Sequence, residues 1–207
     1  MRSQSFVFFL LFVASFSAKA QQFDFNNRCK TTYQQLMALD NAAAQKLLET
    51  EIAENPKNLI PLYLADYSNC LSILFNGSET EFDLLKNKQE ILLEKIETGD
   101  TKSPWFRFCK ANVYLHAAIV RLRFGDNFGA ATRFRKSFLL LKENLQKHPN
   151  FEENKVLYGL EMAIAGAIPE NYQWLSSLMG IKGNIKNGLC YIPHVLNGLK
   201  NMEKIIQ

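Results

Sequence analysis

Histidine and cysteine are the side chains in this chain most able to bind a metal ion or to act as nucleophiles. The three histidines, His116, His148 and His194, are isolated, and none has a second histidine three or four residues away, as a metal-binding pair on a helix would. No serine stands in a Gly-x-Ser-x-Gly turn, and nothing in the sequence orders Cys109 or Cys190 against a histidine. We therefore interpret the histidines as core or surface imidazoles, and we predict no catalytic residue, no metal and no cofactor.

The four cysteines leave their pairing open. They stand 41, 39 and 81 residues apart, at Cys29, Cys70, Cys109 and Cys190. An even number permits two disulfides in three connectivities, but these long spacings fit no compact disulfide framework. Three of the cysteines fall in helical stretches, so buried free thiols are the other interpretation. No pair has the Cys-x-x-Cys spacing of a metal or redox site.

Charge divides the middle of the chain into an acidic and a basic part. Residues 40–100 hold 12 acidic and 5 basic side chains, a net charge of −7, and residues 102–147 hold 10 basic and 2 acidic ones, a net charge of +8. Five of the basic residues flank one turn: Arg121, Arg123, Arg133, Arg135 and Lys136. They are our candidates for contact with an acidic partner or an anionic surface. The alternative is that the acidic helices neutralise them within the molecule.

A second candidate contact follows the break at Ile168-Pro169. We predict a short helix over residues 170–179, which carries the apolar side chains of Trp174, Leu175, Leu178 and Met179. If this helix is exposed, it forms an apolar interaction site centred on Trp174. If it is buried, it fills the core between neighbouring hairpins.

Helices must position all of these side chains, because apolar residues recur at helical spacing and no stretch alternates polar and apolar residues as a strand does. We predict helices at 27–38, 41–54, 59–75, 79–98, 104–124, 127–147, 151–167, 170–179 and 184–206. Ser78 with Glu81 has the form of a capping box, and Ser103-Pro104 that of an N-cap followed by proline. The connections are short, which forces successive helices to be antiparallel neighbours. The sequence therefore predicts an all-α fold of consecutive antiparallel helical hairpins.

The first twenty residues predict export. Arg2 precedes an apolar core at 6–16, and Ala18-Lys19-Ala20 places small residues at the −3 and −1 positions of a cleavage site, the pattern of a secretory signal peptide. The apolar core is shorter than the roughly 20 residues that span a bilayer, and no later stretch is long and apolar enough. We expect cleavage after residue 20, one helical domain over 21–207 with no transmembrane segment, and a place in the periplasm or on the outer surface of a bacterium. The mature net charge of about +2 is too mild to indicate nucleic acid.

An alternation of small and large residues recurs along the chain. Its later copy is a turn followed by a small, a large and a small residue on one helix face: Gly125-Asp126, Ala130, Phe134 and Ser137. The helix before it carries further large and small residues at helical spacing: Tyr114, Ala117 and Ala118. An earlier partial copy has the turn, the small-then-large helix and a closing proline: Asp40, Ala44, Leu48 and Pro56-Lys57-Asn58. Over residues 27–149 the chain thus resembles the tetratricopeptide-repeat family, whose helix-turn-helix units use this alternation.

Both copies depart from the family pattern. Polar or charged residues replace expected ones at Thr31, Thr32, Gln35 and Glu51 in the first copy, and at Arg121 in the second. The resemblance implies a short stacked solenoid with a concave groove for a peptide, a protein segment or another subunit, and no chemistry of its own. An ordinary helical bundle is the alternative architecture.

We therefore expect a non-catalytic exported scaffold or adaptor that binds a protein or peptide partner in the bacterial cell envelope, with peripheral association to that envelope. Two alternatives stay open. One is a carrier of a small apolar ligand, held in a cavity lined by residues such as Phe134, Phe138 and Trp174. The other is an enzyme whose site is assembled from scattered residues, which would show a pocket with converging histidine, glutamate or cysteine side chains.

Overall fold

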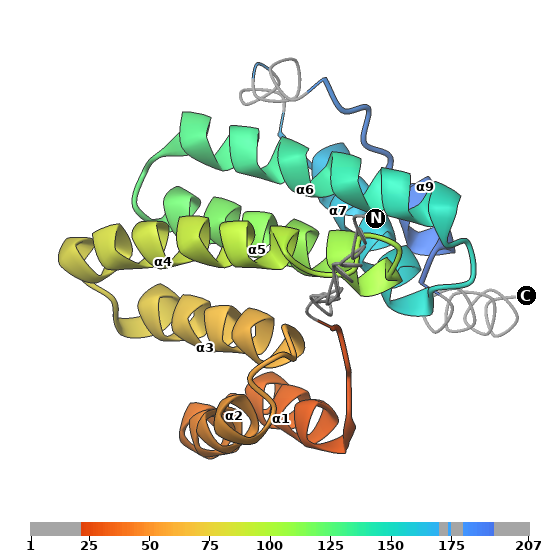
Figure 1. Ribbon diagram of the computed structural model, residues 1–207. Helices are drawn as coiled ribbons and strands as arrows, with labels where there is room; N and C mark the ends of the chain where they lie inside the picture. The colour runs from red at the N-terminus through yellow and green to blue at the C-terminus, as the bar shows by residue number, and fades with distance from the viewer. Residues whose placement is uncertain (1–21, 170–173, 175–179, 193–207) are drawn as a thin grey trace, which may run out of the picture.

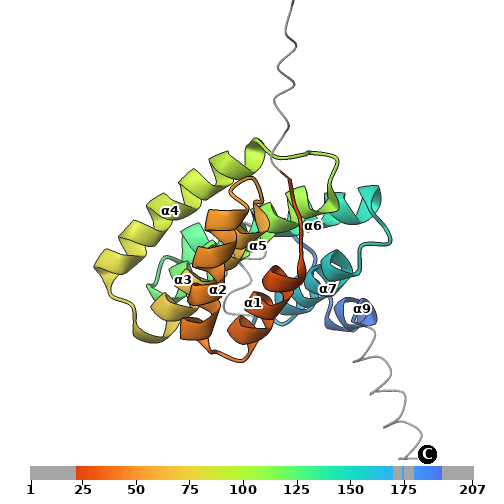
Figure 2. The ribbon, with the colours of Figure 1, turned by 60° about the horizontal axis from the view of Figure 1, so that its bottom comes forward.

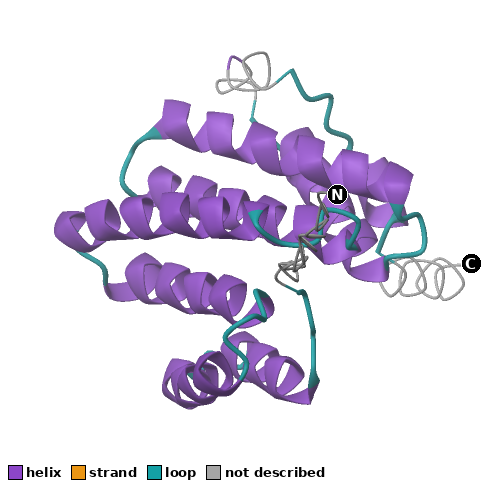
Figure 3. Cartoon of the chain, in the orientation of Figure 1, coloured by secondary structure: helices purple, strands orange, loops and turns teal. Residues whose placement is uncertain are grey.

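The stretches of sequence with apolar residues at helical spacing form helices in the part of the chain that the structure describes. The computed structural model describes residues 22–169, 174 and 180–192. Within these ranges Figure 3 shows helices and loops and no strand. The helices are α1 (Asn27–Met37), α2 (Asn41–Glu54), α3 (Ile60–Asn76), α4 (Glu79–Glu97), α5 (Pro104–Arg123), α6 (Asn127–Lys147), α7 (Glu152–Gly166) and α9 (Ile185–Cys190). The prediction of an all-α fold is confirmed.

Capping side chains set where several of these helices begin, although α3 and α7 have no side-chain cap. The Ser78 hydroxyl accepts a hydrogen bond from the Glu81 backbone N–H, and the Glu81 carboxylate accepts one from the Ser78 N–H at 2.7 Å, so the predicted capping box is confirmed. Ser103 caps α5 with Pro104 in its first turn, and the side chain of Asn184 caps α9. Each of these starts is therefore fixed by hydrogen bonds to residues within three positions.

Consecutive hairpins pack on one another in chain order. In Figure 1 the α1–α2 pair lies at the bottom, α3 and then α4 and α5 lie above it, and α6 lies at the top. Figure 2 brings α1 and α2 to the front and shows α7 and α9 next to each other at the lower right. The core runs through all of these layers, with fully buried side chains from five helices at Leu36, Leu64, Ile96, Val113 and Leu141. The predicted arrangement of antiparallel neighbours is confirmed.

Small residues lie where neighbouring helices approach each other. The small positions of the repeat pattern are buried: Ala44, Ala117, Ala118, Ala130 and Ser137. The α7–α9 crossing is closer still, since a Cβ atom built on Gly159 would lie 2.5 Å from the carbonyl oxygen of Gly188. Only glycine fits at this contact, so α9 packs directly on the backbone of α7.

The C-terminal prediction needs a correction. We predicted one helix over 184–206, but α9 ends at Cys190, and Tyr191 and Ile192 are not helical. Ile192 precedes Pro193, whose ring disfavours helical backbone in the residue before it. The predicted signal peptide, the predicted helix over 170–179 apart from Trp174, and residues 193–207 lie outside the described residues. None of the described helices has the length and apolar character needed to cross a bilayer.

Candidate functional site

The predicted basic residues lie around the turn that joins α5 to α6, and Arg121 is the one that is buried. Only 8% of its surface is exposed. Its guanidinium donates to the Ala117 carbonyl oxygen at 3.3 Å and lies 3.4 Å from the Asp126 carboxylate. Burial lowers the pKa of Arg121, and the nearby positive charge of Arg133 lowers it further. This side chain closes the last turn of α5 and presents no free charge to a partner.

Arg123 joins the ends of two helices. Its guanidinium donates to the carbonyl oxygens of Leu74 at 2.8 Å and Gly77 at 3.3 Å, and it lies 4.9 Å from the Phe124 ring centroid. These carbonyls close the C-terminal end of α3, where the helix dipole favours a positive charge. The α3–α4 and α5–α6 turns are thereby held side by side, at the left of Figure 1.

The remaining basic candidates lie further along α6. Arg133 forms an ion pair with Glu90 of α4 at 2.5 Å, and its guanidinium lies over the ring of Tyr114. The Lys136 ammonium lies 5.2 Å from the same ring, and both Lys136 and Arg135 are exposed. Part of the basic charge is therefore neutralised by the acidic helix α4, while Arg135 and Lys136 stay on the surface.

Large apolar side chains are exposed at the same end of the molecule as Arg123. Phe75 at the end of α3, Leu122 at the end of α5 and Phe128 at the start of α6 are 65%, 54% and 64% exposed. At the same end, Phe82 in the first turn of α4 stacks on Phe124 with ring centroids 4.6 Å apart. We call Phe75, Leu122, Arg123 and Phe128 the turn-end surface. Exposed apolar side chains that gather in one region are typical of interaction sites.

The sequence reasoning missed the apolar part of this surface. The available signal was position, because Phe75 directly precedes the helix-ending Asn76-Gly77 and Phe128 follows the Gly125-Asp126 turn. The other predicted contact, Trp174, is 52% exposed. Its neighbours on both sides lie outside the described residues, so the structure does not join it to the turn-end surface.

A histidine and an aspartate meet inside the core, fifty residues apart in the sequence. The Nδ1 atom of His116 on α5 lies 2.7 Å from Oδ2 of Asp66 on α3, and the Gln89 amide on α4 donates to Oδ1 at 3.1 Å. The imidazole stacks on Tyr67 and Tyr63, with centroids 5.1 and 6.2 Å apart. His116 is thus a core imidazole, as one of our two interpretations predicted, and its polar partners tie three helices together.

This cluster has no accessible nucleophile. The nearby Cys70 thiol is buried and donates to the His116 carbonyl oxygen rather than to its ring, at 3.9 Å. Burial raises the pKa of Cys70 well above its ordinary value, and the negative charge of Asp66 adds to the shift. The thiol is therefore un-ionised at neutral pH and cannot attack a substrate that does not reach it.

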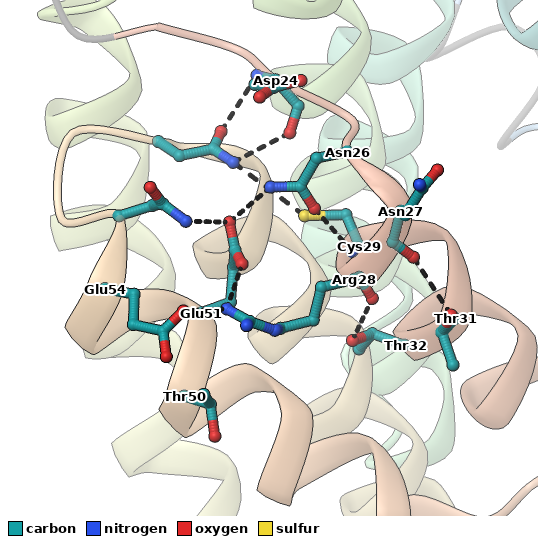
Figure 4. A network of polar contacts seen from close by, with 12 residues as sticks. Asp24, Asn26, Asn27, Arg28, Cys29, Thr31, Thr32, Thr50, Glu51 and Glu54 are labelled. Carbon is teal, nitrogen blue, oxygen red and sulfur yellow. Dashed lines mark hydrogen bonds and ion pairs between the residues drawn. The ribbon is translucent and has the colours of Figure 1, made fainter.

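A second buried network surrounds Glu51 (Figure 4). Its carboxylate accepts hydrogen bonds from Asn26 at 2.6 Å and Asn55 at 2.9 Å, and it forms an ion pair with Arg28 at 2.8 Å. The amide of Asn58 donates to the Asp24 carbonyl oxygen at 2.8 Å. These contacts fasten the N-terminal segment to the α2–α3 turn, so the network is structural.

All four cysteines are free thiols. Three are buried, and Cys190 is exposed. Cys190 lines a hollow of about 320 Å³ together with Met162, Asn187 and Tyr191. Within the described ranges no three histidine, cysteine or acidic side chains are grouped so that they could hold a metal ion.

Two of the three residues named for an apolar ligand cavity, Phe134 and Phe138, instead pack against the protein core. Phe138 is buried and packs on Tyr158 with ring centroids 5.0 Å apart, and Phe134 packs against the same core. The hollow at Cys190 and a smaller one of about 140 Å³ between α3 and α4 are lined by other residues.

No protein-family model matches this chain, and neither a curated protein nor a solved structure is significantly similar to it. The roles of its residues therefore rest on the contacts within the chain.

Proposed function

We propose that this chain is an exported, non-catalytic scaffold of tetratricopeptide-like helical hairpins that binds a protein or peptide partner in a bacterial cell envelope. The turn-end surface is the contact in this proposal. The observation that carries it is the exposure of three large apolar side chains, Phe75, Leu122 and Phe128, at the end where two helical turns are fastened together by Arg123.

The rigidity of this end supports a binding role. The guanidinium of Arg123 bridges the α5 terminus to the α3 terminus, and the Phe82–Phe124 stack lies between α4 and α5. A surface whose helix ends are already held together loses less conformational entropy when a partner docks. Arg135 and Lys136, exposed on α6, add positive charge that steers an acidic partner toward the protein.

The buried polar clusters support a role without chemistry. The described groups that resemble catalytic parts, above all His116 with Asp66, are closed off in the core and bonded to each other. A general acid or base must come within hydrogen-bond reach of its substrate, and these side chains do not meet that condition.

The experiment is a comparison of captured proteins. Residues 21–207 are immobilised, incubated with the envelope fraction of the cells that make the protein, and the captured proteins are identified by mass spectrometry. The test variant combines Phe75→Ser with Phe128→Ser. The control combines Leu160→Ser with Ile164→Ser, an exposed apolar pair on α7.

We expect the test variant to capture at least tenfold less of the partner than the unaltered chain, and the control to capture as much. The reason is that apolar anchors at the centre of an interface contribute about 2 kcal/mol or more to binding. Equal capture by the test variant and the unaltered chain would refute the turn-end surface as the contact. Capture of nothing above background by the unaltered chain would refute the scaffold proposal.

A further inference from the structure

Helices α7 and α9 form a unit that meets the rest of the described chain mainly through α6. Besides α9, α7 packs chiefly on α6, and α9 packs chiefly on α7. The two helices are joined tightly at the Gly159–Gly188 crossing and by the Tyr158 and Tyr191 rings, 5.4 Å apart. We call these two helices the α7–α9 unit. The contacts in the α6–α7 interface therefore hold this unit in position.

Two polar layers lie in the α6–α7 interface, seven residues apart on each helix. In one, the Ser137 hydroxyl of α6 donates to Oε1 of Glu161 of α7 at 2.5 Å. In the other, the Asn144 amide donates to Oδ1 of Asn154 at 2.8 Å. Residues seven apart share a helix face, so both layers lie on the seam of the antiparallel pair.

The two ends of α7 are held differently. Its N-terminal end is anchored to α5 by aromatic packing, because the ring of Phe151 lies 5.0 Å from that of Trp105 and 5.5 Å from that of Phe108. Its C-terminal half relies on Tyr158, which packs on Phe138, and on the Glu161 layer. This half also carries α9.

Glu161 is an acid in an apolar setting. Its side chain is fully buried, and Oε2 has no hydrogen-bond partner within the described residues. A buried charge with one neutral hydrogen bond is strongly disfavoured, so the group keeps its proton instead. Burial raises the pKa of Glu161 to about 8, and the hydrogen bond from Ser137 opposes part of that rise.

No described charge is placed to compensate an ionised Glu161. The group that faces it from α6 is the uncharged Ser137 hydroxyl, and burial and this hydrogen bond are the causes of the shift in the pKa of Glu161. Of the cations on α6, Arg133 pairs with Glu90 of α4, Lys136 lies over Tyr114 of α5, and Arg135 is exposed. Directly after α9, Tyr191 packs on Tyr158, whereas Lys186 and Cys190 of α9 are exposed. Tyr158 is the titratable neighbour on α7 itself, and burial raises its pKa above the ordinary value, so it stays neutral.

We propose that Glu161 is a proton-operated latch: the neutral acid holds the C-terminal half of α7, and α9 with it, on α6, and ionisation releases that half of α7 and α9 while the N-terminal end of α7 and helices α1 to α6 stay in place. The position of Glu161 in the α6–α7 interface supports this proposal, because its carboxyl group is buried against Ser137 of α6. Release would move one carboxylate into water and break one polar layer, whereas the aromatic anchor at Phe151 does not titrate.

The direction of the effect follows from proton binding. The docked state has its pKa near 8, and the released state has the ordinary value of 4.5. The released state therefore loses its proton first, and docking weakens as pH rises through this window. Between pH 6 and pH 9 the equilibrium constant for release should rise on the order of 100-fold.

Amide hydrogen exchange measures this release directly. Protection factors of α7 and α9 amides, corrected for the pH dependence of intrinsic exchange, are compared at pH 6 and pH 9 in residues 21–207, with α2 as an internal reference. We expect protection in the C-terminal half of α7 and in α9 to fall on the order of 100-fold while α2 protection is retained. Glu161→Gln should keep α7 protection within about threefold, because it cannot ionise. The control Glu153→Gln, an exposed glutamate on the same helix, should follow the unaltered chain.

Three results would overturn the latch: α7 protection that does not fall, α2 losing protection together with α7, or Glu161→Gln behaving like the unaltered chain. If Glu161→Gln does not fold, Glu161→Met takes its place, because it removes both the charge and the unpartnered oxygen at similar volume.

Discussion

The substitution Glu51→Gln isolates the energetic value of one buried ion pair. Figure 4 shows the Glu51 carboxylate between Asn26 and Arg28, and the Asn55 amide also donates to it. In the glutamine variant one oxygen remains and can still accept from the two asparagines. The new amide group replaces the oxygen that faced Arg28, so a donor then faces a donor. The main loss is therefore the Arg28–Glu51 interaction.

The expected cost of Glu51→Gln is about 2–3 kcal/mol in the free energy of unfolding. A hydrogen bond to a charged group contributes about 1.5–3 kcal/mol, whereas breaking a fully buried pair costs about 3–5 kcal/mol. The lower range applies because the Arg28 side chain is 32% exposed and keeps Glu54 as a second partner. Water and Glu54 both compensate the guanidinium that is left behind.

Glu54 provides a matched control, because it contacts the same guanidinium at 2.7 Å but is 58% exposed. Exposed ion pairs contribute little, so Glu54→Gln should cost at most about 0.5 kcal/mol. Urea unfolding of residues 21–207 at pH 7 measures both variants. Equal losses in the free energy of unfolding for Glu51→Gln and Glu54→Gln would show that burial does not determine how much the Arg28–Glu51 pair stabilises the fold.

At acid pH the free energies of unfolding of the unaltered chain and of Glu51→Gln should become equal. Burial acts to raise the pKa of Glu51, but hydrogen bonds from Asn26, Asn55 and Arg28 outweigh it, and the net result lies below the ordinary value of 4.5. A lowered pKa gives stability that is present above pH 4.5 and is lost as pH falls through the folded-state value. The two unfolding curves should therefore converge in acid. A gap that persists undiminished would refute the role of the Glu51 charge.

Two further substitutions test the helix contacts. Ala130→Leu should destabilise the chain by roughly 1–3 kcal/mol through overpacking at a buried helix crossing, and Ala42→Leu at an exposed position of α2 should be nearly neutral; equal melting temperatures for the two variants would contradict this. Ser78→Ala should cost about 1 kcal/mol by removing the α4 capping box, compared with the exposed Thr80→Ala by urea unfolding, and no difference between them would mean that the cap contributes nothing.

The sequence predicted the helices closely because their signals are local. The predicted bounds of α2 and α6 agree with the structure, those of α1, α4 and α5 differ by one residue at the C-terminal end, and those of α3 and α7 differ by one residue at both ends. A capping side chain acts on backbone groups two or three residues away, as Ser78 does on Glu81, so the necessary information is contiguous. The prediction failed at α9, where Tyr191 and Ile192 leave the helix before a proline.

The sequence predicted the basic residues of the candidate site but not its exposed apolar side chains. The basic residues around the α5–α6 turn could be named from composition, but their exposure could not. Arg121 and Arg123 are two residues apart, yet the first is buried against Ala117 and Asp126 and the second bridges to the end of α3. Which of them faces water depends on the neighbouring helix that covers one side of α5, and nothing within the α5 sequence specifies that neighbour.

The sequence by itself determined the helices, their order and the separation of acidic from basic segments. Tertiary structure alone decided the polar pairs: His116 with Asp66 across 50 positions, and Ser137 with Glu161 across 24. A helix presents side chains from every third or fourth residue to its neighbour, so many registers would bury a similar apolar area. Only the packed arrangement fixes which donor reaches which acceptor, and a buried polar group left unpaired is costly enough to make that choice matter.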